Sequence, residues 1–374
     1  MIDKVLLYPY YLSLKLRDRR YSRPGRKLEY AEVPTLCVGN VTAGGTGKTP
    51  HVEMVLRLLR EHPDWSGKSL AMLSRGYKRD STGFQQVVAT GSATMYGDEP
   101  LQVKKKFPEV TVVVDSDRVE ACDLLAHPEK MKNRKVAKKC WDREFPKADY
   151  IVLDDAFQYR KLKANKNIVL VDWNRPVQKD HLLPLGRLRD LPERIFDADA
   201  LIVTKCPSEM DELEKAKFVE ELGFTDYLPS EYEATNPKGS RQLIFFTTVR
   251  YGQVTGVYST AEPRYTYAKK AIVLTGIASD GPMCSYLSDF YKIIRHFRFP
   301  DHHRFAWKDI NKIQAAVDQT PTAAIITTEK DAQRLLDYVG MPESLMQRLF
   351  YVPITVDFLS DDERERFTEF VASV

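Results

Sequence analysis

The sequence is poor in cysteine and lacks the long apolar runs of membrane-spanning proteins. Its five cysteines are widely spaced and form no C-x-x-C pair, which argues against a disulfide framework or a zinc site and is typical of a reducing cytoplasm. No stretch of about 18 apolar residues occurs, so we expect neither a membrane-spanning helix nor a signal peptide. The net charge of +4 is too small to indicate a partner, and we expect no nucleic acid and no required protein partner.

The chain also lacks internal repeats and low-complexity segments. Its composition, 43% hydrophobic and 29% charged, is typical of a globular protein, and its 374 residues leave room for about two domains.

Short apolar runs recur along the chain, and each is followed by turn residues and a helical pattern. Continuous apolar strands that alternate with helices predict an α/β fold, with a mostly parallel sheet and helices on both of its faces. Ligands bind such sheets at the carboxyl ends of the strands. The expected strands are Leu36–Val38, Leu70–Leu73, Val110–Val114, Tyr150–Leu153, Ile168–Val171 and Leu201–Val203.

A glycine-rich turn follows the first of these strands and leads into a helical pattern from His51. A strand, a glycine loop and a helix in this order predict a phosphate-binding loop. In such a loop Lys48 reaches the β- and γ-phosphates of a nucleotide, and the Thr49 hydroxyl binds Mg²⁺. The expected nucleotide-binding residues are Thr42, Ala43, Gly44, Gly45, Thr46, Gly47, Lys48 and Thr49.

The strict phosphate-loop pattern requires a glycine where this chain has Thr42. The alternative is a glycine-rich turn that binds nothing, but such a turn has no use for Lys48 and Thr49 after three glycines.

Two adjacent carboxylates, Asp154 and Asp155, end the apolar strand that begins at Tyr150. This is the form of a Walker B strand, whose aspartate holds Mg²⁺ directly or through water. Two neighbouring carboxylates also repel each other unless a cation lies close to them. We therefore expect Asp154, Asp155 and Thr49 to bind the metal.

The N-terminal 27 residues are apolar and tyrosine-rich at first and strongly basic afterwards. This pattern suits an interfacial helix on an anionic membrane, with Pro9 starting or kinking it. The alternative is a helix that packs on the core of the protein and has a solvated basic end.

The region 241–267 is rich in Thr, Val, Tyr and Phe on both sides of Tyr251-Gly-Gln253, which predicts a β-hairpin. A smaller α/β unit is expected after it, with strands at Ala271–Leu274, Lys292–Phe297 and Ala323–Thr327. The segment 128–147 is interpreted as a solvated helix or insertion. The expected organisation is a membrane-interface helix at 1–27, a nucleotide-binding kinase domain at 28–240, a hairpin linker at 241–268 and a C-terminal domain at 269–374.

Taken together, the motifs resemble one family over nearly the whole chain, the tetraacyldisaccharide 4′-kinases of lipid A synthesis. Thr42 fits the phosphate loop of that family. The motifs are Gly39-Asn-Val-Thr-Ala-Gly-Gly-Thr-Gly-Lys-Thr-Pro50, Ser74-Arg-Gly-Tyr77, Gly97-Asp-Glu-Pro100, Asp117-Arg118, Leu153-Asp-Asp-Ala-Phe-Gln158, Leu182-Leu-Pro-Leu-Gly-Arg-Leu-Arg189, Thr275-Gly-Ile-Ala278, Phe299-Pro-Asp-His302 and Thr328-Glu-Lys-Asp331.

The resemblance implies a P-loop kinase that uses ATP and Mg²⁺ to phosphorylate the 4′-hydroxyl of a lipid-linked glucosamine disaccharide 1-phosphate. It implies a peripheral enzyme at the cytoplasmic face of the bacterial inner membrane. Asp98 matches the catalytic base of the family, and His302 matches the histidine paired with it. Arg75 and Arg118 match basic positions suited to phosphate contact.

Two positions depart from the family pattern. Ala156 stands where the family commonly has Gly, and Asp190 stands where it commonly has Glu. Asp190 is expected at a substrate or phosphate contact together with Arg75 and Arg118, although its shorter side chain puts a role as a direct or indirect metal ligand in doubt.

The main alternative is a membrane-associated switch ATPase of the partitioning type, which requires a lysine where this chain has Ala43. A GTP-binding protein requires Asp in its guanine-reading motif, and Thr204-Lys-Cys-Pro207 lacks it. A non-enzymatic lipid-binding module has no use for Lys48 and the aspartate pair.

Overall fold

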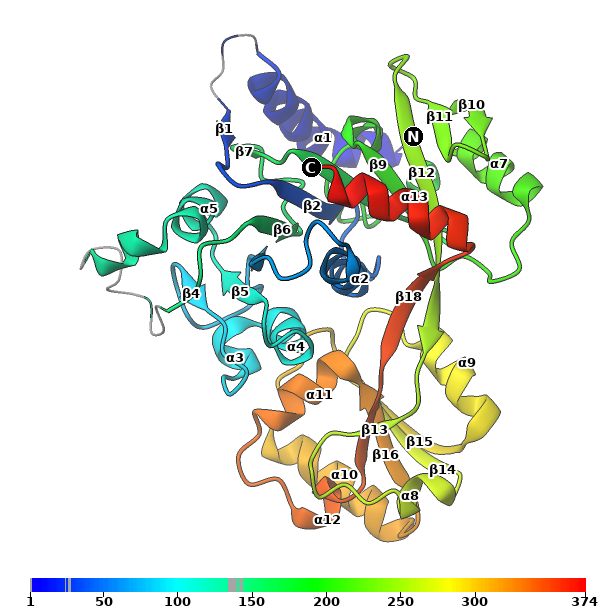
Figure 1. Ribbon diagram of the computed structural model, residues 1–374. Helices are drawn as coiled ribbons and strands as arrows, with labels where there is room; N and C mark the ends of the chain where they lie inside the picture. The colour runs from blue at the N-terminus through cyan, green and yellow to red at the C-terminus, as the bar shows by residue number, and fades with distance from the viewer. Residues whose placement is uncertain (1, 24, 26–27, 134–139, 141–143) are drawn as a thin grey trace.

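The computed structural model describes residues 2–23, 25, 28–133, 140 and 144–374. A large α/β body carries both chain ends, and a smaller α/β body lies beside it, as Figure 1 shows. Two long strands, drawn in green and red, run from one body to the other.

The large body is built on one extended sheet. Its parallel strands lie in the spatial order β12, β9, β8, β2, β6, β3 and β5. All six strands expected from the apolar runs are present. They are β2 (Thr35–Asn40), β3 (Leu70–Ser74), β5 (Thr111–Val114), β6 (Tyr150–Asp154), β8 (Lys166–Asp172) and β9 (Ala200–Thr204).

Side chains of these strands are buried on both faces of the sheet. On β2, Leu36 and Val38 belong to one apolar cluster and Cys37 belongs to another, since successive side chains point to opposite faces. The helices of this body include α2 (Lys48–Glu61), α3 (Ala93–Tyr96), α4 (Asp98–Lys106), α5 (Arg118–Ala126) and α7 (Glu212–Glu221). Short antiparallel strands extend this sheet on both sides: β4 (Gln85–Gln86) lies beside β5, β11 (Glu233–Thr235) lies beside β12, and β10 (Thr225–Leu228) lies beyond β11. Separately, β1 (Glu29–Tyr30) pairs with β7 (Leu162–Lys163).

The smaller body has its own sheet, in the order β13, β17, β16, β14 and β15. Its strands are β13 (Thr255–Gly256), β14 (Lys270–Thr275), β15 (Lys292–Arg298), β16 (Ala324–Thr328) and β17 (Leu349–Val352). Its helices are α8 (Arg264–Tyr267), α9 (Gly281–Phe290), α10 (Trp307–Gln319), α11 (Glu329–Leu336) and α12 (Glu343–Met346). The three strands expected here from sequence are β14, β15 and β16.

The expected β-hairpin at 241–268 does not form. β12 (Arg241–Tyr251) pairs with β9 and with β18 (Ile354–Phe358), whereas β13 pairs with β17. The chain does not fold back on itself directly after β12. The antiparallel partner of β12 is β18, which begins about a hundred residues later, directly after Pro353. The two bodies are therefore joined by two antiparallel strands from distant parts of the sequence.

The C-terminal helix returns to the large body. Phe367 of α13 (Asp361–Ala372) is buried in the cluster that covers one face of the main sheet, and the Tyr150 hydroxyl donates to the Val371 carbonyl. The expected C-terminal domain, 269–374, is therefore revised to end near Pro353. Of the segment 128–147, the structure describes a short 3-10 helix, Pro128–Lys132, while 134–139 and 141–143 lie outside the described residues.

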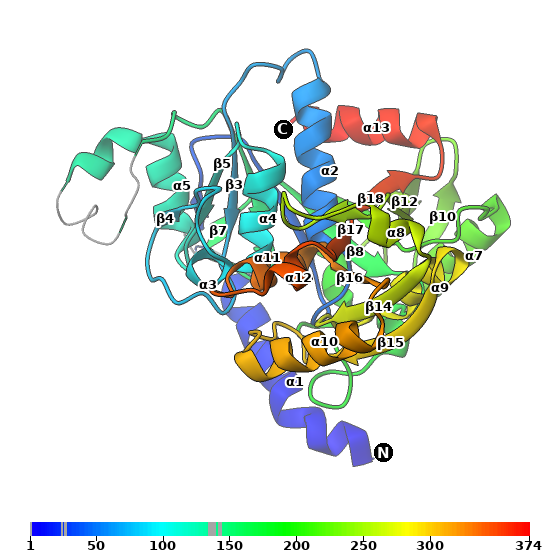
Figure 2. The same ribbon diagram turned by 90° about the horizontal axis from the view of Figure 1, so that it is seen from below.

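The N-terminal helix α1 (Ile2–Tyr21) continues through Pro9 without ending there. Leu7 and Leu14 are buried against the large body, while Tyr8, Tyr11, Leu12 and Leu16 are exposed. In Figure 2 the N-terminal end of α1 extends away from the rest of the molecule. Among the described residues, no helix has the length and hydropathy needed to cross a membrane.

Candidate active site

The loop between β2 and α2 has the backbone of an anion-binding turn. Gly44, Gly45 and Gly47 have φ angles of 70°, 67° and 81°, a region that favours glycine. Inside the loop, the Asn40 side-chain amide donates to the Thr46 hydroxyl at 2.6 Å. Sequence reasoning missed this role of Asn40, although the residue ends the strand directly before the loop.

Two segments from other parts of the chain lie against this loop. The Ala43 backbone N–H donates to the Arg187 carbonyl at 2.6 Å, and Thr42 forms a β-bridge with Leu188. A Cβ placed on Gly44 would lie 3.8 Å from the Cβ of Ala278, which belongs to the smaller body. Both bodies therefore contribute to the surroundings of the loop.

The first turn of α2 is fixed by a buried histidine that the sequence did not single out. The two ring nitrogens of His51 contact the Gly47 carbonyl at 2.7 Å and the Thr247 hydroxyl at 2.9 Å. Burial lowers the pKa of His51 to about 4, so the ring is neutral. It ties the start of α2 to β12 without adding charge beside the phosphate loop.

The carboxyl end of β6 places Asp154 and Asp155 beside Lys48. The Lys48 Nζ atom lies 3.8 Å from Oδ1 of Asp155, and Asp155 also pairs with Arg189, whose Nη1 donates to Oδ2 at 2.9 Å. Although burial acts in the opposite direction, Lys48 and Arg189 lower the pKa of Asp155. Asp155 is thus held as a carboxylate, in a left-handed backbone conformation with φ of 53°.

Asp154 is in the opposite electrostatic state. Burial, followed by the charges of Glu99 and Asp155, raises its pKa to about 7. One of its oxygens accepts a hydrogen bond from Ser74 at 2.9 Å, and Oδ1 is buried without a hydrogen-bond partner among the described residues. A buried carboxylate oxygen that lacks a partner beside a second carboxylate fits an oxygen-binding cation such as Mg²⁺.

Asp98 and His302 come from different bodies and meet in the structure. Asp98 begins α4, and Oδ2 of its buried carboxylate lies 3.2 Å from Nδ1 of His302. The Lys330 Nζ lies 3.3 Å from the His302 Nε2. These contacts are satisfied when Nδ1 carries the proton and donates to Asp98, while Nε2 accepts from Lys330.

Asp98 is further surrounded by cations that sequence reasoning did not assign. The Arg334 guanidinium makes two hydrogen bonds to Oδ2 of Asp98, one of them from Nε at 2.9 Å, and Asp331 holds the same guanidinium at 2.6 Å. Burial works against ionisation, but His302, Lys330 and Arg334 hold the pKa of Asp98 well below its usual range. Lys330 and Asp331 lie in the Thr328-Glu-Lys-Asp331 motif, which was the available signal, and Arg334 lies one helical turn beyond it.

Arg118 and Arg75 follow neighbouring strands, β5 and β3. Arg118 is buried, its Nε has no hydrogen-bond partner among the described residues, and Arg75 is exposed. Burial and the charge of Arg75 both lower the pKa of Arg118. Two guanidinium groups that repel each other at a strand end form a site suited to an anion.

Asp190 does not lie in this group. Its carboxylate is fully buried under α1, 2.9 Å from Arg17, 3.7 Å from Arg160 and 3.9 Å from Arg194. Three guanidinium groups thus surround the shorter side chain, although the Asp190 backbone N–H donates to the Val41 carbonyl, directly before the phosphate loop, at 3.3 Å. This position argues against the expected substrate contact of Asp190 and indicates that it anchors α1.

Comparisons with known proteins give one consistent result. The sequence model of the family described as tetraacyldisaccharide-1-P 4′-kinase matches residues 4–373. A tetraacyldisaccharide 4′-kinase of Parabacteroides distasonis is 35% identical, with 95% of this chain and 89% of that protein covered. One of Flavobacterium johnsoniae is 32% identical, with 96% and 94% covered.

Among solved structures, LpxK from Aquifex aeolicus in complex with ATP is similar in fold, with a TM-score of 0.67 over 99% of both chains and 24% identity. With the family model covering nearly all residues and the fold shared over the full length, this chain belongs to the tetraacyldisaccharide-1-P 4′-kinase family.

Proposed function

We propose that this protein is an ATP-dependent kinase that phosphorylates the 4′-hydroxyl of a tetraacyl glucosamine disaccharide 1-phosphate in lipid A synthesis. The observation that carries the proposal is the convergence of three sets of side chains between the two bodies. These are the phosphate loop with Lys48, the carboxylates that end β6, and the Asp98–His302 pair. The similarity to relatives named as such kinases favours this activity over a partitioning-type ATPase.

In this proposal the loop 42–49 binds the phosphates of ATP through its backbone N–H groups, and Lys48 neutralises the charge of the γ-phosphate. Asp154, Asp155 and Thr49 would hold Mg²⁺, which supplies positive charge to the phosphate oxygens when bound. Lys48 lies 3.8 Å from Asp155, so the lysine and the proposed metal ligands would reach the same phosphate group.

Asp98 and His302 would act on the acceptor hydroxyl. Lys330 and Arg334 keep Asp98 ionised, which makes it a weak base but a strong hydrogen-bond acceptor. In the loose transition state of phosphoryl transfer, the hydroxyl becomes acidic only as its bond to phosphorus forms. A carboxylate of low pKa is sufficient to align the hydroxyl and to receive its proton late, and His302 orients that carboxylate.

Arg75 and Arg118 are proposed to contact a phosphate group of the nucleotide or of the acceptor. An anion between them would relieve their mutual repulsion. Arg118 also stacks on the Tyr159 ring, with 5.3 Å from the guanidinium carbon to the ring centroid, which limits its freedom to turn away.

The activity assay uses purified protein, Mg-ATP and a tetraacyl disaccharide 1-phosphate, and records the mass and the position of the phosphate in the product. We expect one phosphate added at the 4′-position and ATP consumption that depends on the acceptor. ATP hydrolysis at an equal rate without the acceptor would contradict the kinase proposal and return the protein to the class of switch ATPases.

We also propose that the protein binds peripherally to the cytoplasmic face of the inner membrane through α1, where a lipid substrate is available. The support is the exposed face formed by Tyr8, Tyr11, Leu12 and Leu16. Arg17 is excluded from this surface because it pairs with the buried Asp190. The remaining basic residues near the end of α1 are Arg19, Arg20 and Arg23.

Vesicle sedimentation tests this surface. The double variant Leu12→Ser, Leu16→Ser should lose binding to anionic vesicles, and Arg19→Glu with Arg20→Glu should weaken binding more at low salt than at high salt. Leu213→Ser is a matched control, since Leu213 is 81% exposed but lies on α7. Unchanged vesicle binding of the Leu12 and Leu16 double variant would favour a helix that serves only to pack on the core.

A further inference from the structure

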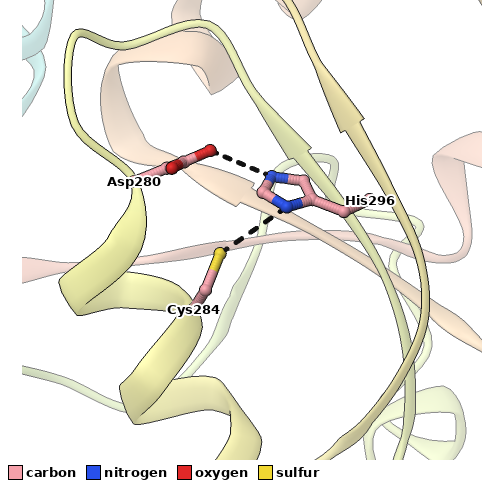
Figure 3. Close-up of side chains that lie close together, drawn as sticks. All are labelled: Asp280, Cys284 and His296. Atoms are coloured by element: carbon pink, nitrogen blue, oxygen red, sulfur yellow. Dashed lines mark hydrogen bonds and ion pairs between the residues drawn. The ribbon is translucent and has the colours of Figure 1, made fainter.

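Asp280, Cys284 and His296 form a compact cluster at the edge of the smaller sheet. Asp280 precedes α9, Cys284 lies in the first turn of that helix, and His296 lies on the edge strand β15 (Figure 3). The Cys284 backbone N–H donates to the Asp280 carbonyl at 2.9 Å, so a regular helical turn fixes the spacing of the first two side chains. None of the three belongs to the residues assigned above to the kinase reaction.

The geometry of the cluster is defined by the imidazole ring. The Cys284 Sγ lies 3.8 Å from Nδ1 of His296, and Oδ2 of Asp280 lies 3.2 Å from Nε2. One potential ligand atom from each side chain lies within 4.8 Å of the other two. Figure 3 shows the Asp280 carboxylate and the Cys284 sulfur contacting different nitrogens of the His296 ring.

We propose that Asp280, Cys284 and His296 form a binding site for a divalent transition metal of the zinc class. Zinc takes thiolate, imidazole and carboxylate ligands, at about 2.3 Å for sulfur and about 2.0–2.1 Å for nitrogen. Around a tetrahedral ion these bond lengths place sulfur and nitrogen about 3.6 Å apart. The observed 3.8 Å between Cys284 and His296 is close to that separation, and rotation of the Asp280 side chain would bring in the third ligand.

The donor set of the cluster suits a metal ion. An imidazole nitrogen offers a lone pair to a cation, and a bound cation displaces the proton of a thiol.

Two neighbouring residues, Thr275 and Arg298, contact the side chains of the cluster. The Thr275 hydroxyl lies 2.8 Å from Nε2 of His296 and can hold that nitrogen while Nδ1 binds the ion. Arg298 now pairs with Asp280 at 3.0 Å, but its side chain is 69% exposed and can leave without exposing a buried charge. The thiolate and the carboxylate together balance the charge of a divalent ion.

The cluster also adjoins the proposed catalytic region through the chain. Thr275 donates to Asp280 at 2.8 Å, and the next residue, Gly276, donates its N–H to Asp331 and accepts from Arg334. A bound ion would therefore help to hold the loop between β14 and α9 in place. Loss of the ion should lower the Tm of the full-length protein, because a ligand that binds only the folded state stabilises it.

The test is a titration of the metal-free, full-length protein with Co²⁺, followed by displacement with Zn²⁺. We expect one equivalent to give visible bands of tetrahedral cobalt and a near-ultraviolet charge-transfer band from a cobalt-bound thiolate. Cys284→Ser should remove the charge-transfer band, and His296→Gln should weaken the affinity about tenfold or more. Zinc should abolish both sets of bands and raise the Tm of the wild type but not of Cys284→Ser.

Two matched controls separate this site from other donors. Cys206→Ser removes a buried thiol elsewhere, and His127→Gln removes a histidine that lies 2.9 Å from Glu32 and 3.3 Å from Glu129. Both should keep the wild-type cobalt spectrum. The proposal is overturned if the wild type gives no thiolate band at stoichiometric cobalt, or if the band persists in Cys284→Ser. The readout is a spectrum rather than turnover, so failure of the kinase assay would not affect it.

Discussion

The Asp98–His302 pair offers the sharpest test of the proposed mechanism. The two residues come from different bodies, and the fold brings them into direct contact. The perturbation is a double-mutant cycle made of Asp98→Asn, His302→Gln and the double variant. Both substitutions keep the size and part of the hydrogen bonding of the native side chain. With the two groups 3.2 Å apart, removal of either one should disable the same proton transfer.

The expected magnitude follows from this geometry. A positioned general acid or base contributes about 10²–10⁴-fold to the rate, so each single variant should lose about 10³-fold in kcat, which is about 4 kcal/mol. If the residues act as a unit, the double variant should also lose only about 10³-fold, whereas independent contributions would multiply to about 10⁶-fold. The coupling energy is then about as large as the effect of either single substitution.

The assay measures initial rates over ranges of ATP and of the lipid acceptor, so that kcat and KM are obtained separately. The loss should fall on kcat, because proton acceptance matters in the transition state more than in binding. His303→Gln is the matched control. It removes the neighbouring histidine, which instead contacts Asp309 at 2.9 Å, and should leave kcat near that of the wild type. Losses that multiply, or a silent His302→Gln with an inactive His303→Gln, would refute the pairing.

Three further outcomes are expected. Lys48→Ala should lower kcat/KM by about 10²–10³-fold or more with little change in Tm, because its side chain faces the nucleotide site rather than the core, and steady-state kinetics with Mg-ATP will show this. Near-normal turnover would remove the loop from the nucleotide site. The pKa of Asp154 is raised to about 7 in the folded state, whereas the unfolded chain releases this proton near pH 4. The free energy of unfolding should therefore fall as the pH rises from about 4 through 7. In the presence of a chelator, the stability advantage of Asp154→Asn over the wild type should therefore grow between pH 4 and pH 8, by up to roughly 4 kcal/mol in urea unfolding. A difference in unfolding free energy that stays constant over this pH range would contradict the raised pKa. Asp190→Ala should destabilise the protein by about 1–3 kcal/mol, because it removes the carboxylate partner of Arg17 and one of the two carboxylate partners of Arg160 and of Arg194, which also pair with Asp18 and Asp197. A loss below about 1 kcal/mol would show that Asp190 is not the anchor of α1.

The local signals in the sequence were sufficient for the elements that carry the phosphate chemistry. An apolar strand, a run of glycines and a helical pattern are set by neighbouring residues, so the loop from Thr42 to Thr49 lies where it was expected. The same holds for the strand that ends at Asp154, because continuous apolar residues followed by a carboxylate occupy one short stretch of chain. The sequence motifs also identified the family, which the comparisons confirmed.

The joining of the two bodies was decided by contacts between distant segments. The stretch 241–267 has the composition of a hairpin, but β12 gains more by pairing with β9 and β18 within a large sheet than by folding back on a short partner. In the same way α13 returns to the main sheet, where Phe367 is buried among apolar side chains of distant strands. Neither preference is visible in a local pattern.

The sequence by itself determined the strand, the glycine loop and the helix around Thr42–Thr49 and the family of the protein, and only the tertiary structure decided which charges meet. Arg334 and Asp98 are 236 residues apart in the chain yet share a buried ion pair, and Arg17, in the basic part of the N-terminal segment, pairs with the buried Asp190. The physical reason is that the energy of a charge depends on its burial and its partner, and both are set by the packing of the whole chain.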